Sequence, residues 1–223
     1  MEEKTTNDLP KVRLKRFSGI ELCDEAIGQC HNSGPKQTIE EQTKRIQKVG
    51  LKMKHESVLE HIVFTFDISN ISRALLQEFA RHRIASLTVK SSRYTLKELK
   101  TEEPFHVSQL QNTTGQERIL KYVKLTKNDK VNAKIIETLE GVRELIKEGI
   151  SNDITKYALP DAYKTSLTWT INARALRNFL QLRTNKAALW EIRDLAYAVY
   201  DSILPSEKFL FEDVIYKKDE KAD

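Results

Sequence analysis

The stretch Val63–Arg83, VFTFDISNISRALLQEFARHR, contains both kinds of local structure from which this chain is built. Its first part, 63–68, is rich in β-branched and aromatic residues, which is typical of a strand. Its second part, 71–82, predicts a helix, with Asn70 or Ser72 as the candidate N-cap residue. A strand that leads directly into a helix is therefore the first expectation for the fold.

The rest of the chain predicts more helix than strand. Further strands are expected at 12–17 and 163–171, helices at 39–53, 134–150, 153–159, 173–182 and 187–204, and a polar loop at 101–116. The apolar stripe of the first long helix is Ile135, Leu139, Val142 and Ile146, and that of the last is Leu189, Ile192, Leu195 or Ala196, Val199 and Ile203. No internal repeat or linker is apparent, and residues 217–223 form a charged tail. We expect an α+β fold, a mainly helical single domain over residues 1–223, with a small, largely antiparallel sheet.

Composition narrows the class of protein. The 223 residues are 39% apolar and 31% charged, and they contain no apolar run long enough for a membrane helix. The start, Met1–Lys4, lacks the apolar core of a secretory signal. Only Cys23 and Cys30 are present, and neither has metal-ligand spacing, so we expect a cytoplasmic protein without a disulfide framework, a metal or a membrane contact. The net charge of +5 favours anionic ligands.

The arginine-rich segment 81–94 is the strongest chemical signal. Arg81, His82 and Arg83 are followed, after seven residues, by Ser91, Ser92 and Arg93. Guanidinium groups bind phosphate with paired hydrogen bonds, so the segment suits a phosphorylated ligand. Basic residues at a helix C-terminus also complement the helix dipole, and the spacing alone does not separate these interpretations.

Two further segments carry polar residues in an ordered pattern. The run 55–61, HESVLEH, has a histidine at each end, but a zinc-protease motif needs the second histidine at position 59, which is Leu59. The run 169–183, WTINARALRNFLQLR, is an amphipathic helix candidate that carries two asparagines and three arginines.

Taken together, the runs 55–66, 81–94 and 169–183 resemble the motifs of the flavin-dependent thymidylate synthases, and the resemblance extends over about residues 12–204. It implies an enzyme, a methyltransferase, that converts dUMP to dTMP. It also implies FAD as cofactor, NADPH as reductant, 5,10-methylenetetrahydrofolate as the carbon donor and a homotetramer with shared active sites. No nucleic-acid partner is implied.

The resemblance assigns residues to roles. Arg183 is implied to be catalytic, polarising the uracil ring. The implied dUMP-binding residues are Glu78, Arg81, Val89, Lys90, Ser91, Ser92, Arg93, Lys156 and Arg183. The implied FAD-binding residues are His55, Ser57, Arg81, His82, Arg83, Val89, Asn172, Ala173, Arg174 and Asn178. The chain departs from the common family pattern at Glu78, Thr88-Val89, Lys156 and Ala187.

Helical geometry adds one expectation. Arg174 and Asn178 are four residues apart and share a helix face, whereas Arg183, nine residues after Arg174, falls on the opposite face. Either the helix ends before Arg183, or the site is shared between subunits.

Two other classes of protein compete with this interpretation. A non-enzymatic nucleic-acid-binding protein would account for the basic pI of about 9.0, but not for three ordered motifs of arginine and asparagine. A different flavin oxidoreductase is disfavoured because the sequence lacks the G-x-G-x-x-G fingerprint of a Rossmann-type site. A flavin spectrum of the purified protein would separate the first alternative from the enzyme.

Overall fold

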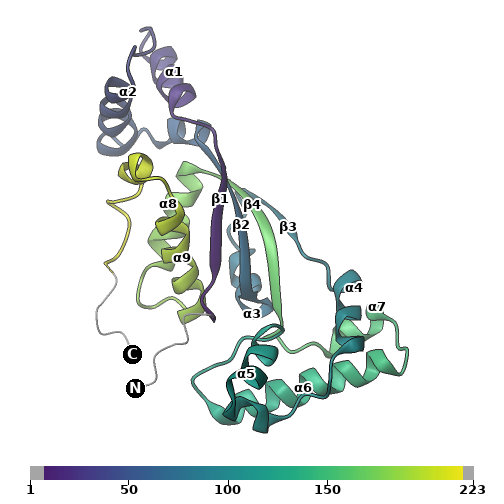
Figure 1. Cartoon of the computed structure of the whole chain (residues 1–223). Coiled ribbons are helices and arrows are strands. Elements are labelled where there is room, and N and C mark those ends of the chain that lie inside the picture. The colour runs from purple at the N-terminus through teal and green to yellow at the C-terminus, as the bar shows by residue number, and fades with distance from the viewer. Residues whose placement is uncertain (1–7, 218–223) are drawn as a thin grey trace. The chain divides into compact units, whose positions relative to one another are not determined.

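The computed structural model describes residues 8–217 and confirms an α+β fold that is mainly helical (Figure 1). Its strands are β1 (Lys11–Phe17), β2 (Val63–Ser72), β4 (Lys164–Asn172) and β3 (Ala85–Val89), which form a four-stranded antiparallel sheet in that order. β1 pairs antiparallel with β2, and the register shifts between Leu14 and Arg16. Among residues 8–217 no helix is both long and apolar enough to span a membrane.

The contacts divide the described chain into two compact units, of which the larger holds residues 10–69, 78–88 and 167–217. Besides most of the sheet, it contains α1 (Glu21–Cys30), α2 (Ile39–Ile46), η2 (Gln47–Lys52), η3 (Glu56–His61), α8 (Ala173–Arg183), α9 (Trp190–Ser202) and η7 (Pro205–Leu210). Its core is aromatic: the Trp169 ring lies 4.7, 5.1 and 5.7 Å from the rings of Phe79, Phe179 and Phe66. These buried rings fix α8 against the sheet.

The smaller unit holds residues 8–9, 70–77 and 89–166. It contains most of α3 (Arg73–Phe79), then α4 (Ser92–Thr95), η4 (Leu96–Thr101), η5 (Val107–Gln111), α5 (Thr113–Leu120), α6 (Asp129–Lys147), α7 (Asn152–Thr155) and η6 (Lys156–Ala158). The predicted apolar stripe of α6 is buried and packs with Phe105, Tyr122 and Tyr163. Figure 1 shows α4 next to α7 in this unit.

Most predicted elements are confirmed, with five corrections. The helix expected at 71–82 is shorter, because β2 continues to Ser72 and α3 ends at Phe79. The loop expected at 101–116 contains η5 and the start of α5, whose N-cap Asn112 accepts a hydrogen bond from the Gly115 amide at 2.7 Å.

α6 begins five residues earlier than predicted because Asn128 caps it. Leu189 is not in the buried stripe of α9, since it precedes the helix and is exposed. Finally, α1, η3, β3, α4, η4 and η7 were not predicted.

The same kind of strand–cap–helix junction occurs at the ends of β2 and β4. Ser72 ends β2 and its Oγ accepts from the Leu75 amide at 2.9 Å; Asn172 ends β4 and its Oδ1 accepts from the Ala175 amide at 2.8 Å. Serine and asparagine can both fill this position, because each side chain offers an oxygen to the unpaired amides at the helix start. Of the two proposed caps for the first helix, Ser72 is the one used.

Candidate active site

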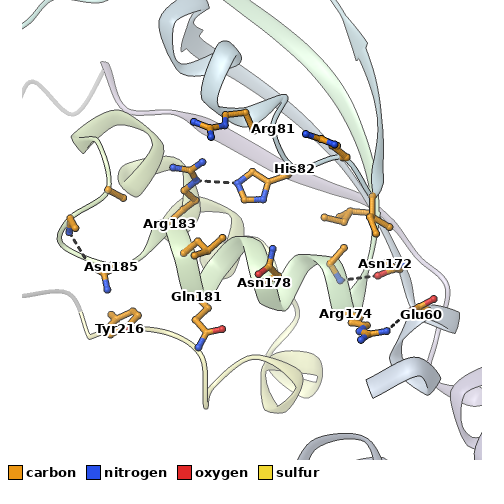
Figure 2. Close-up of a pocket in the computed structure, with 17 residues that line it drawn as sticks. Glu60, Arg81, His82, Asn172, Arg174, Asn178, Gln181, Arg183, Asn185 and Tyr216 are labelled. Atoms are coloured by element: carbon orange, nitrogen blue, oxygen red, sulfur yellow. Dashed lines mark hydrogen bonds and ion pairs between the residues drawn. The ribbon is translucent and has the colours of Figure 1, made fainter. Parts of the chain in front are cut away.

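A broad groove follows α8 in the larger unit. Its volume is about 1230 Å³, more than the roughly 300–1,000 Å³ typical of small-ligand pockets. The residues that line it come from η3, β4, α8, the loop after α8, the turn after α3 and the C-terminal segment (Figure 2). They are Glu60, Arg81, His82, Arg83, Ile84, Ile171, Asn172, Arg174, Ala175, Asn178, Gln181, Leu182, Arg183, Asn185, Ala187, Ala188 and Tyr216.

Polar residues recur along one side of α8. Arg174, Asn178, Gln181 and Asn185 follow each other at intervals of four, three and four residues, so the three within the helix share a face. Arg174 Nη1 donates to Glu60 Oε1 at 2.7 Å, although the Arg174 side chain stays half exposed. The groove therefore offers a guanidinium near one end and amide groups along its length (Figure 2).

Arg183 is the last residue of α8 and is held by two side chains from the end of α3 and the turn after it. Its Nε donates to His82 Nε2 at 3.0 Å, and its Nη1 donates to Glu78 Oε2 at 3.1 Å (Figure 2 shows the first). Only 18% of the Arg183 side chain is exposed. A guanidinium held by two acceptors has a fixed direction, which a flexible surface arginine lacks.

His82 accepts this hydrogen bond because its ring is neutral. Burial, followed by the nearby positive charges of Arg183 and Arg81, lowers the pKa of His82 to about 4. The ring also packs edge-on against Phe179, with centroids 5.0 Å apart. Arg81 and Arg83 lie in the turn directly beyond Phe79, at the C-terminal end of α3, and both border the groove.

A smaller cavity of about 360 Å³ is also lined by Arg174. His55 and Ser57 line it together with Cys30 and Lys54. Because Arg174 borders both cavities, the two predicted flavin-binding segments, 55–57 and 172–178, meet at this side chain.

The chain matches the family described as "Thymidylate synthase complementing protein", Thy1, over residues 16–206. It is 50% identical over 202 residues to the flavin-dependent thymidylate synthase of Wolinella succinogenes, covering 90% of this chain and 96% of that protein. It is 42% identical over 213 residues to that of Helicobacter pylori, covering 92% and 99%. A crystal structure of the Helicobacter pylori enzyme ThyX with FAD and dUMP superposes with a TM-score of 0.85 at 41% identity, covering 94% of this chain and all of that one.

The chain belongs to the flavin-dependent thymidylate synthases. The resemblance drawn from three short motifs is thus confirmed, together with the implied activity, conversion of dUMP to dTMP. The nucleic-acid-binding alternative is no longer needed to explain the basic charge.

For a flavin-dependent thymidylate synthase, the predicted site residues divide between the two units. The larger unit brings together Glu78 and Arg81–Arg83 with Asn172, Arg174, Asn178 and Arg183 around α8. Ala173 is fully buried at the start of α8 and does not border the groove. Its amide donates to the Ile62 carbonyl at 2.8 Å, so its observed contact is structural.

The smaller unit holds the other predicted dUMP residues, which are Val89, Lys90, Ser91, Ser92, Arg93 and Lys156. Arg93 Nε lies 2.5 Å from Asp153 Oδ1, and the Asn152 amide group donates to the Arg93 carbonyl at 2.6 Å. Lys156 Nζ lies 5.5 Å from the Tyr157 ring centroid. These contacts place Arg93 beside α7, the helix that leads to Lys156.

The expectation that one helix cannot direct Arg174, Asn178 and Arg183 to one pocket is wrong. α8 is unbroken to Arg183, and all three side chains border the same groove, because the groove is wide enough to extend around the helix. The opposite-face argument therefore no longer supports a shared site.

Sequence reasoning missed several groove residues. Gln181 and Asn185 continue the spacing of Arg174 and Asn178, so helical periodicity could have found them. Glu60 lies within the 55–61 motif but was given no role. Tyr216 had no signal, since it reaches the groove only through the return of the C-terminal segment.

Acid should weaken the fold through His82. A neutral ring with a lowered pKa stabilises the folded state fully above the ordinary histidine pKa of about 6.5, and this contribution is lost as the pH falls toward about 4. In denaturant unfolding, the difference between the wild type and His82→Gln should therefore be larger at pH 7 than at pH 5. Because all other titrating groups are common to both proteins, their effects cancel in the difference in unfolding free energy. An equal difference at both pH values would contradict the neutral-ring assignment.

Neither cysteine should serve as a catalytic nucleophile. Cys23 is fully buried, and burial with the neighbouring Asp24 charge raises the pKa of its thiol to about 12, which disfavours the reactive thiolate. Cys30 is exposed and lines the smaller cavity. We expect the double variant Cys23→Ala, Cys30→Ala to keep most of its dTMP formation. Loss of turnover in a folded, flavin-loaded double variant would show that a thiol takes part.

Proposed function

We propose that this enzyme binds FAD along the α8 groove and dUMP next to Arg183, takes its one-carbon unit from 5,10-methylenetetrahydrofolate and is reduced by NADPH. The observation that carries the proposal is Arg183 itself, a largely buried guanidinium fixed by His82 and Glu78 at the border of the groove. The relative from Helicobacter pylori, solved with FAD and dUMP, supports both ligands.

The residues of the groove fit a flavin dinucleotide. A long anionic molecule needs space and fixed positive charge, and the groove combines about 1230 Å³ with Arg81, Arg83 and Arg174. Asn178 adds hydrogen-bonding groups along the same wall. We assign Arg83, His55, Ser57, Asn172, Arg174 and Asn178 to FAD, with Arg81 and His82 at its border with dUMP. The Asn172 side chain already caps α8, so its contribution to FAD binding would be to hold the first turn of this helix in place.

The phosphate of dUMP needs bidentate donors. In the larger unit we assign this role to Arg81; in the smaller unit, taken by itself, we assign it to Arg93 and the serine hydroxyls of the 89–93 segment, aided by Lys156. Ser91 is assigned to binding and not to attack, because a serine nucleophile needs an adjacent general base to activate it.

Arg183 supplies the electrostatic part of catalysis. Its positive charge would stabilise negative charge that develops on the uracil ring as the ring attacks the carbon donor. Bound FAD supplies the hydride chemistry, which no side chain can perform. Since His82 and Glu78 fix the guanidinium beforehand, little reorganisation is required when the charge develops.

Omission assays test this proposal. The purified protein should show an oxidised-flavin spectrum and form dTMP only when dUMP, methylenetetrahydrofolate and NADPH are all present. Formation of dTMP without NADPH, or from another carbon donor alone, would overturn the cosubstrate assignment. A colourless protein that gains no activity with added FAD would overturn the cofactor assignment.

We also propose that residues 1–223 act as one functional domain in the cytoplasm. The family match at 16–206 runs through both compact units, and the two cysteines are unpaired, as is usual for a reducing compartment.

The enzyme should form a homotetramer. Large apolar side chains are exposed in the smaller unit, with Tyr157 at 86%, Tyr94 at 71% and Ile154 at 67%, which is unusual unless a partner covers them. Light scattering should give a mass near four times 25.8 kDa. A fully active monomer would disprove the prediction.

A further inference from the structure

The Tyr216 ring borders the α8 groove from a segment to which no motif points. It is 47% exposed and lines the groove together with Asn185, Ala187 and Ala188. Figure 2 shows Tyr216 next to Asn185, at the end of the groove away from Arg174. The aromatic ring of Tyr216 and the two small alanine side chains give this end of the groove an apolar wall.

The segment that carries Tyr216, residues 211–217, is fixed to α8 by a bidentate ion pair. We call this segment the C-terminal strap. Arg177 Nη1 lies 2.6 Å from Asp213 Oδ1, and Arg177 Nη2 lies 2.7 Å from Asp213 Oδ2. Arg177 is buried and also donates to the Leu210 carbonyl, and its guanidinium lowers the pKa of Asp213. Because a buried arginine is costly without its partner, this pair holds the strap strongly.

The backbone of Tyr216 is itself tied to the end of α8. Its amide donates to the Oγ1 of buried Thr184 at 3.2 Å. The Tyr197 hydroxyl lies 3.1 Å from the Tyr216 carbonyl oxygen and 3.2 Å from that of Thr184, so it connects the two segments. Thr184 directly follows Arg183, so the backbone of Tyr216 is tied to the end of α8, and its tethers use only main-chain atoms.

We propose that the Tyr216 ring is a stacking surface for a planar ring of the bound flavin dinucleotide. This inference rests on the proposed FAD site. FAD has two planar rings, isoalloxazine and adenine, and aromatic side chains bind such rings through their faces. An aromatic residue whose backbone is already tied to α8 is suited to this, because less of the chain has to be ordered when the ligand binds.

Flavin titration of the apoprotein tests the role without measuring turnover. Flavin is removed from the wild type and from Tyr216→Ala, Tyr216→Phe and Tyr200→Ala, and FAD binding is followed by calorimetry. Tyr200 is a matched control because it lies on α9 and does not line the groove. Its ring centroid is 4.7 Å from Lys208 Nζ. Tyr216→Ala should fold normally because its tethers are main-chain atoms, and its melting temperature checks this.

Loss of one base–aromatic stack should weaken FAD binding by roughly 5- to 150-fold in Tyr216→Ala. Tyr216→Phe, which keeps the ring, and Tyr200→Ala should bind like the wild type. If the ring stacks on isoalloxazine, the fluorescence of bound FAD should rise in Tyr216→Ala, because a stacked tyrosine quenches it. If it stacks on adenine, competition by AMP should weaken and the fluorescence should not change.

Unchanged FAD affinity in folded Tyr216→Ala would overturn the inference, and so would an equal loss in Tyr216→Phe, which would assign the effect to the hydroxyl. A wild-type apoprotein that binds no FAD would overturn the proposed function instead, so the two failures are distinguishable.

Discussion

Arg183→Ala should retain FAD and lose dTMP formation by a factor on the order of a hundred to a thousand, the usual cost of removing a positioned group that stabilises developing charge. Arg183 is suited to this role because His82 Nε2 and Glu78 Oε2 fix two of its nitrogens at 3.0 and 3.1 Å. The measurement is turnover with dUMP compared with flavin bound per chain. An Arg183→Ala enzyme as active as the wild type would refute the assignment.

Arg174→Ala is the matched control, since it removes the same side chain from the other end of the same groove. Arg174 borders both cavities and pairs with Glu60, so its loss should first reduce flavin retention. Turnover per bound flavin should then fall less than in Arg183→Ala. Equal loss of flavin in the two variants would mean that the roles are not separate.

Phe179→Ala should destabilise the fold by about 3–5 kcal/mol, as large-to-small changes of buried aromatic residues do. Phe179 is fully buried, with ring centroids 5.1 Å from Trp169, 5.5 Å from Phe79 and 5.0 Å from His82. For a chain of this length, such a loss corresponds to a fall in melting temperature of roughly 6–20 °C. Calorimetric melting measures the change.

Phe179→Leu keeps an apolar side chain and should cost less than Phe179→Ala. Leu22→Ala is the control for removal of an apolar side chain at the surface, because Leu22 is 56% exposed and its loss should change stability by no more than about 0.5 kcal/mol. A Phe179→Ala protein that melts like the Leu22→Ala protein would show that the aromatic core does not hold α8 in place.

The sequence by itself determined the family and most of the secondary structure. The stripe of α6 and the strand candidates were readable because burial on one face imposes a period of 3.6 or 2 on apolar residues. Arg81, Arg174, Asn178 and Arg183 were readable because their order matches that of a known family. Local signals left the cap of α3 open between Asn70 and Ser72, of which Ser72 is used, and they missed Asn128, so α6 starts five residues before the prediction.

Only the tertiary structure decided how the site is built. Glu78 and His82 lie more than a hundred positions from Arg183 in sequence, and no local pattern shows that they accept hydrogen bonds from its guanidinium. The neutral state of His82 depends on burial and on two neighbouring positive charges, which exist only in the folded chain. Tyr216 reaches the groove through an ion pair between α8 and the C-terminal strap. Such contacts depend on distance in space, whereas periodicity and propensity record only neighbours along the chain.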